Sequence, residues 1–190
     1  MFVRKAALRP VPRWAVVGQE AVDAVERLVT GTEPGLQRAL DAGYRDLDRR
    51  QPFLAAWLAE QISTRGDELA QSVGYFLSVT VFLAFHEAFA GRLREIDREA
   101  IALAAGILQA DEELRADDPA EVLDSDDVLR LGQPAVIDWV QHHVREAIAQ
   151  ADEETDLDAL DAVYRAILVE VIALTDAVAA PAGEPLQEPA

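Results

Sequence analysis

Apolar residues recur every three or four positions along most of this chain, which is the spacing of one face of an α-helix. Two segments show the pattern clearly, QPFLAAWLAEQI at 51–62 and QPAVIDWVQHHV at 133–144. Each predicts an amphipathic helix in which a tryptophan, Trp57 or Trp139, anchors an aliphatic stripe against the core. The stripe residues are Leu54, Leu58 and Ile62 in the first segment and Val136, Val140 and Val144 in the second.

A proline stands at the second position of both segments and predicts where each helix begins. Proline is favoured at the first helical position because its missing N–H would have no partner there and its φ is already helical. We therefore expect helices to start at Pro52 and Pro134. No proline interrupts 53–118 or 135–180, so long helices can follow. No segment alternates apolar and polar residues like a half-buried strand.

The similarity continues weakly into the next helix of each segment, where residues 67–90 align with 156–179. We predict two related helical hairpins, at about 51–90 and 133–179, that pack together as a four-helix core. Duplication is one explanation, and chance similarity between two sequences rich in Ala and Leu is the other. The matched pairs are Asp67 and Asp156, Tyr75 and Tyr164, Ala84 and Ala173, Ala88 and Ala177, and Ala90 and Ala179.

Further helices are expected around these hairpins. Apolar spacing predicts one helix at 18–30, and Pro34 falls in the first turn of another. Asp97 is a predicted cap for a helix that runs to about Arg115, and the DPAE sequence at 118–121 resembles another helix start. The fold class predicted from the sequence is therefore all-α, a helical bundle of about seven to eight helices around the two related hairpins.

The predicted bundle forms a single domain at 14–180, with a short segment at either end. Residues 1–13 are expected to be a basic flexible arm, and residues 181–190 a disordered tail rich in proline. The apolar run Leu69–Phe85 carries no charge over 17 residues, which is the lower limit for a membrane span. It contains several polar residues, so we interpret it as the buried helix of a soluble bundle.

The net charge of −18 limits the partners that the chain can have. Residues 111–190 carry 21 acidic and 4 basic side chains. Such a field repels phosphate backbones, so nucleic acid is not an expected partner, and only the basic arm with Arg4, Lys5, Arg9 and Arg13 could attract it. A membrane partner is not expected either. The acidic clusters lack the spacing of a calcium loop and fall near predicted helix starts, where carboxylates complement the helix dipole. Cysteine is absent, which suits a cytoplasmic protein.

Most covalent and nucleotide-dependent chemistries lack a candidate residue. Lys5 is the only lysine, and no G-x-G-x-x-G or G-x-S-x-G motif is present. His143 and Glu146 stand three apart on a predicted helix, but the H-x-x-E order is the reverse of the motif found in di-iron bundles. His86, Glu87, Glu60 and Glu170 have no usable spacing. Glu170 is expected to lie away from the apolar stripe of its helix, facing solvent or a partner.

We therefore expect no enzyme, no cofactor and no catalytic, cofactor-binding or metal site. The leading hypothesis is an acidic interaction or scaffolding module that self-associates through a small-residue helix face. Two alternatives are a bundle that binds a small apolar ligand at a run of phenylalanines, and a metal-dependent enzyme that uses His and carboxylate ligands. The small-residue face consists of Ala162, Ala166, Ala173 and Ala177, and the phenylalanine run of Phe76, Phe82, Phe85 and Phe89.

Overall fold

The computed structural model describes residues 7–117, 124–152 and 155–183, and these residues form eight α-helices and no β-strand. The predicted all-α bundle is therefore confirmed. Two short 3-10 helices, η1 (Arg13–Ala15) and η2 (Ala90–Arg92), accompany the α-helices. The α-helices are α1 (Gln19–Val29), α2 (Glu33–Arg50), α3 (Pro52–Ser63), α4 (Glu68–Phe89), α5 (Arg98–Ala116), α6 (Ser125–Gly132), α7 (Pro134–Gln150) and α8 (Leu157–Ala177).

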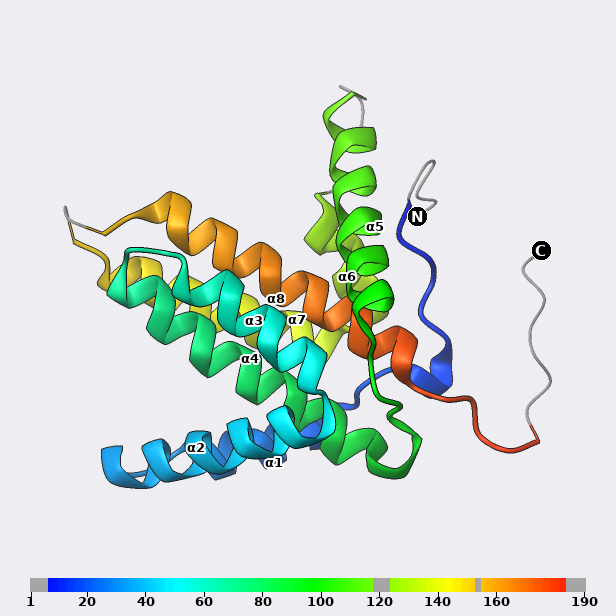
Figure 1. Ribbon diagram of the computed structural model, residues 1–190, viewed down its shortest axis with the longest axis horizontal. Helices are drawn as coiled ribbons and strands as arrows, with labels where there is room; N and C mark the ends of the chain where they lie inside the picture. The colour runs from blue at the N-terminus through cyan, green and yellow to red at the C-terminus, as the bar shows by residue number, and fades with distance from the viewer. Residues whose placement is uncertain (1–6, 118–123, 153–154, 184–190) are drawn as a thin grey trace.

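Four of these helices form the centre of the molecule. The long helices α4 and α8 lie side by side and run in the same direction, with α3 and α7 packed against both (Figure 1). At the N-terminal ends of α4 and α8, the backbone N–H of Asp156 donates to the Asp67 carboxylate at 3.1 Å. Beyond its other end, the N–H of Arg94 donates to the carbonyl of Ala177 at 3.0 Å. The two central helices are thus held together at both ends.

The remaining helices cover this centre, two from each half of the chain. In the first half of the chain, α1 and α2 pack on α4, and α2 also packs on α3. In the second half, α5 packs on α8, and α6 packs on α7 and α5. Figure 1 shows α1 and α2 along one side of the bundle, while the far end of α5 projects beyond it. Each half therefore supplies two outer helices and one inner hairpin.

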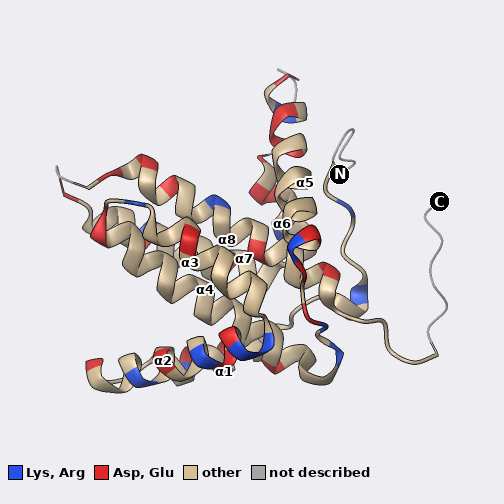
Figure 2. Cartoon of the chain, in the orientation of Figure 1, with Lys and Arg blue, Asp and Glu red and all other residues tan. Residues whose placement is uncertain are grey.

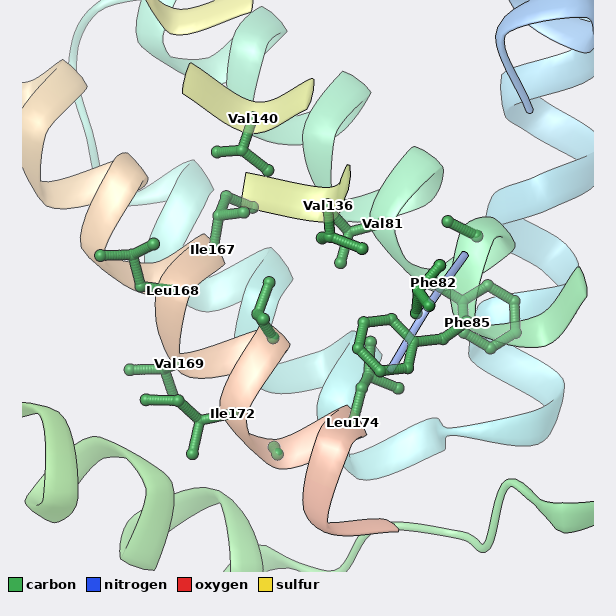
Figure 3. Packing of buried hydrophobic residues seen from close by; sticks show 14 of the residues in the cluster. Val81, Phe82, Phe85, Val136, Val140, Ile167, Leu168, Val169, Ile172 and Leu174 are labelled. Atoms are coloured by element: carbon green, nitrogen blue, oxygen red, sulfur yellow. The ribbon is translucent and has the colours of Figure 1, made fainter. Parts of the chain in front are cut away.

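The interior between α4, α7 and α8 is packed with large apolar side chains (Figure 3). Phe82 and Phe85 of α4 are fully buried, and Val136 of α7 and Leu174 of α8 lie beside them. Phe89 is also buried, and the half-buried Phe76 packs against the same cluster. Ordinary core packing thus accounts for the phenylalanine run.

One helical stretch of the described residues, Glu68–Arg92, is long and apolar enough to cross a membrane. It contains all of α4, and 56% of its most apolar window is buried inside the structure. Central helices of soluble bundles have this composition because partners surround them on every side. The position of α4 agrees with the predicted buried helix of a soluble protein.

The two Gln-Pro sequences adopt nearly the same backbone conformation. Gln51 precedes α3 with φ −135° and ψ 58°, and Gln133 precedes α7 with φ −132° and ψ 62°. The helices begin at Pro52 and Pro134, as predicted. Both glutamine side chains are buried, so each amide needs partners for its donor and acceptor atoms.

Each buried glutamine finds those partners in the backbone segment that precedes the first α-helix of the other half. Gln133 Oε1 accepts from the N–H of Val17 at 2.9 Å, and its Nε2 donates to the carbonyl of Ala15 at 2.8 Å. Gln51 Oε1 accepts from the N–H of Ile96 at 2.8 Å, and its Nε2 donates to the carbonyl of Arg94 at 2.9 Å. The glutamines therefore tie the two halves to each other reciprocally.

The described part of the expected N-terminal arm is packed against the bundle rather than extended into solvent. The N–H groups of Ala7 and Leu8 donate to the carboxylate of Asp111 at 2.8 and 3.3 Å, and the Leu8 side chain is buried. Burial of Leu8 offsets the cost of ordering this segment. The expected DPAE helix start and most of the expected tail at 181–190 lie outside the described residues.

Candidate functional site

The sequence-selected histidines and carboxylates do not converge on one site. Glu60 and Glu87 are exposed on α3 and α4. His86 lies on α4 and faces Asp46 of α2, with 3.7 Å between its Nε2 and a carboxylate oxygen. His143 and Glu146 remain together on α7, with 3.3 Å between Nδ1 and Oε2.

A third side chain, which the sequence reasoning missed, joins this α7 pair. His142 Nε2 lies 3.5 Å from the same Glu146 oxygen. Adjacent residues on a helix point about 100° apart, so the two histidines did not look like partners. Glu146 stands three and four positions after them, however, and both spacings face a helical neighbour. The HHxxE spacing was the signal that could have found this cluster.

The His143 ring is fixed between two aromatic side chains. It meets the Trp139 ring edge-on at 4.3 Å and the Phe76 ring at 4.8 Å between centroids. Its Nε2 atom is buried and makes no hydrogen bond. Burial and then the neighbouring His142 lower the pKa of His143, against the opposing effect of Glu146. His143 is therefore neutral at pH 7.

The two expected core tryptophans both pack against the main apolar cluster while remaining partly exposed. Trp139 also donates its Nε1–H to the Thr80 hydroxyl on α4 at 3.2 Å. An indole that is fixed by both packing and a hydrogen bond holds α7 at a set distance from α4. This placement agrees with the core-anchor interpretation.

Glu170 lies inside the bundle, and the expectation that it faces solvent or a partner was wrong. Its exposed fraction is 0%, and neither carboxyl oxygen has a hydrogen-bond partner. The sequence of α8 indicates one apolar stripe, but α8 packs against α3, α4, α5 and α7 and is buried on almost every side. Burial raises the pKa of Glu170 well above its ordinary value, because the ionised carboxylate would lose its hydration there.

The expected self-association face on α8 is also buried within the chain. Ala166, Ala173 and Ala177 are no more than 8% exposed, and Ala162 is half-buried. The same crowding around α8 explains this error. These residues cannot receive a second copy without unfolding, so they are not the association surface.

Three neighbouring carboxylates at the start of α6 already serve structural roles. Asp124 and Asp127 form a reciprocal capping box around the first turn. Asp126 accepts hydrogen bonds from the Tyr164 hydroxyl at 2.7 Å and from Gln141 Nε2 at 3.0 Å. The cluster is thus accounted for by helix capping and by packing between α6, α7 and α8.

The largest contrast on the surface is an uncharged side of α5, hereafter the α5 face. Leu103 is 62% exposed and Leu114 is 41% exposed. Residues 100–110 contain no charged side chain, and Figure 2 shows the middle of α5 without charge between its charged ends. Sequence reasoning predicted the α5 helix and missed its exposed apolar side. The α5 face consists of Ala102, Leu103, Gly106, Ile107, Ala110 and Leu114.

A small apolar cavity adjoins one edge of the α5 face. It has a volume of about 180 Å³ and lies between α5, α6, α8 and the N-terminal segment. Leu103 and Ile107 contribute to its wall, so the α5 face continues into a shallow recess. Its other apolar walls include Leu8, Val11, Leu129 and Ile172.

Comparison of the chain with known protein families, with curated proteins and with solved structures gives no match. The fold and these sites therefore define the molecule as an all-α bundle with two surface features, the α5 face and the α7 histidine cluster.

Proposed function

We propose that this protein is a non-enzymatic, acidic interaction module that self-associates through the α5 face. The observation that carries the proposal is the exposure of Leu103 within the uncharged residues 100–110 of α5, with the exposed Leu114 one turn beyond them, in a chain of net charge −18. Large exposed apolar patches on soluble proteins commonly mark interaction surfaces. Other large apolar side chains are also exposed, but they lie one each on five other helices, whereas α5 carries two: Leu28, Phe53, Leu131, Ile148 and Leu157.

Charge favours this face for contact between two copies. Two acidic chains repel each other over most of their surfaces, because contact would bring carboxylates together. The α5 face avoids that cost along residues 100–110. A two-fold axis would place the same apolar residues on both sides of the contact, as in most homodimers.

The shape of the face suits packing against another helix. No atom lies within 4 Å of the place where a Cβ would stand on Gly106. A side chain from a second copy can therefore approach the α5 backbone closely at that point. One helix face is a small interface, so we expect weak and concentration-dependent association.

The proposal is tested by replacing Leu103 with Glu and measuring the mass by sedimentation velocity over a range of concentrations. We expect the wild-type chain to reach a dimer at high concentration, and the Leu103→Glu variant to remain a monomer. In this variant, the introduced glutamate of each copy would face an apolar surface across the contact, and burying such an unpaired charge costs several kcal/mol. Added salt should strengthen the wild-type dimer because it screens the repulsion between the acidic chains.

The matched control is Leu28→Glu, which introduces the same charge at a similarly exposed leucine on α1. We expect this variant to associate like the wild type. A wild-type chain that is monomeric at every concentration would remove self-association from the proposal. Equal loss of association in both variants would contradict the choice of the α5 face.

The other expectations for this protein belong with this proposal. An acidic, cysteine-free bundle with no nucleic-acid or membrane partner fits the cytoplasm. Binding of a small apolar ligand is the weaker alternative, because the cavity beside the α5 face, about 180 Å³, is smaller than the ~300 Å³ of ordinary ligand pockets. A larger cavity of about 470 Å³ between α5, α6 and α8 is lined mostly by charged side chains, which do not suit an apolar ligand.

A further inference from the structure

The side chains of His142, His143 and Glu146 converge on the exposed side of α7. One nitrogen from each histidine and one carboxylate oxygen all lie within 4.8 Å of one another. The oxygen of Glu146 is shared, at 3.5 Å from His142 Nε2 and 3.3 Å from His143 Nδ1. A tetrahedral zinc ion with bonds near 2.05 Å separates its ligand atoms by about 3.3 Å. Both measured separations match that spacing.

We propose that His142, His143 and Glu146 form a binding site for a divalent transition-metal ion such as Zn²⁺. Two imidazoles and one carboxylate are ligands typical of zinc, nickel and copper, whereas calcium and magnesium prefer oxygen ligands alone. Three protein ligands leave a fourth position for water or for a group from another molecule.

The surroundings of His143 orient one ligand before the metal arrives. Trp139 and Phe76 hold its ring, and the side chain is only 23% exposed. Its buried Nε2 meets no hydrogen-bonding group, so the nitrogen that faces Glu146 is the one available for a metal. When Nδ1 binds the ion, the proton moves to Nε2, which lies among aromatic rings that accept a weak N–H···π contact.

The other two ligands can adjust to the ion. The His142 and Glu146 side chains are 59% and 53% exposed, so small rotations can complete the coordination without repacking the core. The negative field of the chain also favours cations over anions at this surface. The site is independent of the α5 face, because its ligands lie on a different helix.

The test is a calorimetric titration of the full, tag-free chain with Zn²⁺ at pH 7.5 after treatment with a chelator. We expect one ion per chain. The His142→Ala and Glu146→Gln variants should each lose at least tenfold in affinity, because each removes one of three ligands. His143→Phe keeps the aromatic packing and should lose as much. Binding should weaken at low pH, because protons compete with the metal ion for the ligand atoms.

The matched control is His86→Ala, because His86 is the only other histidine of the chain and lies on α4. This variant should bind Zn²⁺ like the wild type. Lack of saturable binding by the wild-type chain would overturn the proposal. Unchanged affinity in a His142→Ala and Glu146→Gln double variant would also overturn it, as would loss of binding only in Asp126→Asn, which would move the site to α6.

Discussion

Glu170 carries a buried carboxyl group whose two oxygens have no hydrogen-bond partner. A buried polar group without a partner costs about 1–3 kcal/mol, since it loses its contacts with water and gains none. The raised pKa of Glu170 adds to that cost at pH values above the ordinary pKa of a glutamate. At such a pH the carboxyl of the unfolded chain is ionised, so folding requires uptake of a proton. Glu170 therefore lowers the stability of the bundle, and an apolar residue of similar size would remove the penalty.

We predict that Glu170→Leu stabilises the fold by about 2 kcal/mol at pH 7, as measured by urea unfolding. The gain should increase with pH. The unfolded carboxyl ionises near 4.5, while the folded one keeps its proton to higher pH, so wild-type stability falls as the pH rises above that value. Measurements from about pH 5.5 to 8 test this slope and avoid the isoelectric point near 4.4.

Glu60→Leu is the matched control, because Glu60 is exposed on α3 and its replacement should change stability by less than about 0.5 kcal/mol. A Glu170→Leu variant that is less stable than the wild type at every pH would show that the carboxyl has a partner. A gain that does not change with pH would contradict the raised pKa.

At the scale of single elements, a buried glutamine precedes each of the helix starts at Pro52 and Pro134. Each glutamine amide accepts from one backbone N–H and donates to one backbone carbonyl two residues away, so it bonds a segment of the other half as a neighbouring strand would. The two backbone conformations agree within a few degrees. We propose that the halves are related by duplication, and this reciprocal contact supports the proposal because chance similarity would not require it.

We predict that Gln51→Ala and Gln133→Ala destabilise the fold by similar amounts, about 3 kcal/mol each, in urea unfolding. Each change leaves a buried N–H and a backbone carbonyl without the glutamine partner, at about 1–3 kcal/mol per buried group. Gln37→Ala, at an exposed glutamine of α2, should change stability by less than about 0.5 kcal/mol. If one of the two buried glutamines proved dispensable, the equivalence of the halves would be contradicted.

The sequence predicted individual helices better than their surroundings. Proline and Asp97 marked the starts of α3, α7 and α5 because caps and first turns depend on a few adjacent residues. The periodicity of apolar residues identified one apolar stripe on α8, but the pattern could not give the number of helices that pack around α8. Only the packing of the helices therefore showed that Glu170 and Ala166 are buried and that Leu103 is exposed.

At the scale of the whole molecule, the acidic charge and the uncharged α5 face act in opposite directions. The net charge of −18 keeps copies apart at long range, and salt weakens that repulsion. The α5 face provides apolar contact at short range, where Leu103 and Leu114 can leave water. We expect their balance to give an association that is specific but weak, as suits a reversible interaction module.

Native mass spectrometry of the untreated, full-length chain over a range of concentrations tests this account most directly. We predict a species at twice the chain mass of 20.8 kDa whose share grows with concentration, because the α5 faces of two copies then meet. A single species at 20.8 kDa at every concentration would contradict self-association. A reproducible organic mass on the monomer would instead favour a ligand-binding bundle.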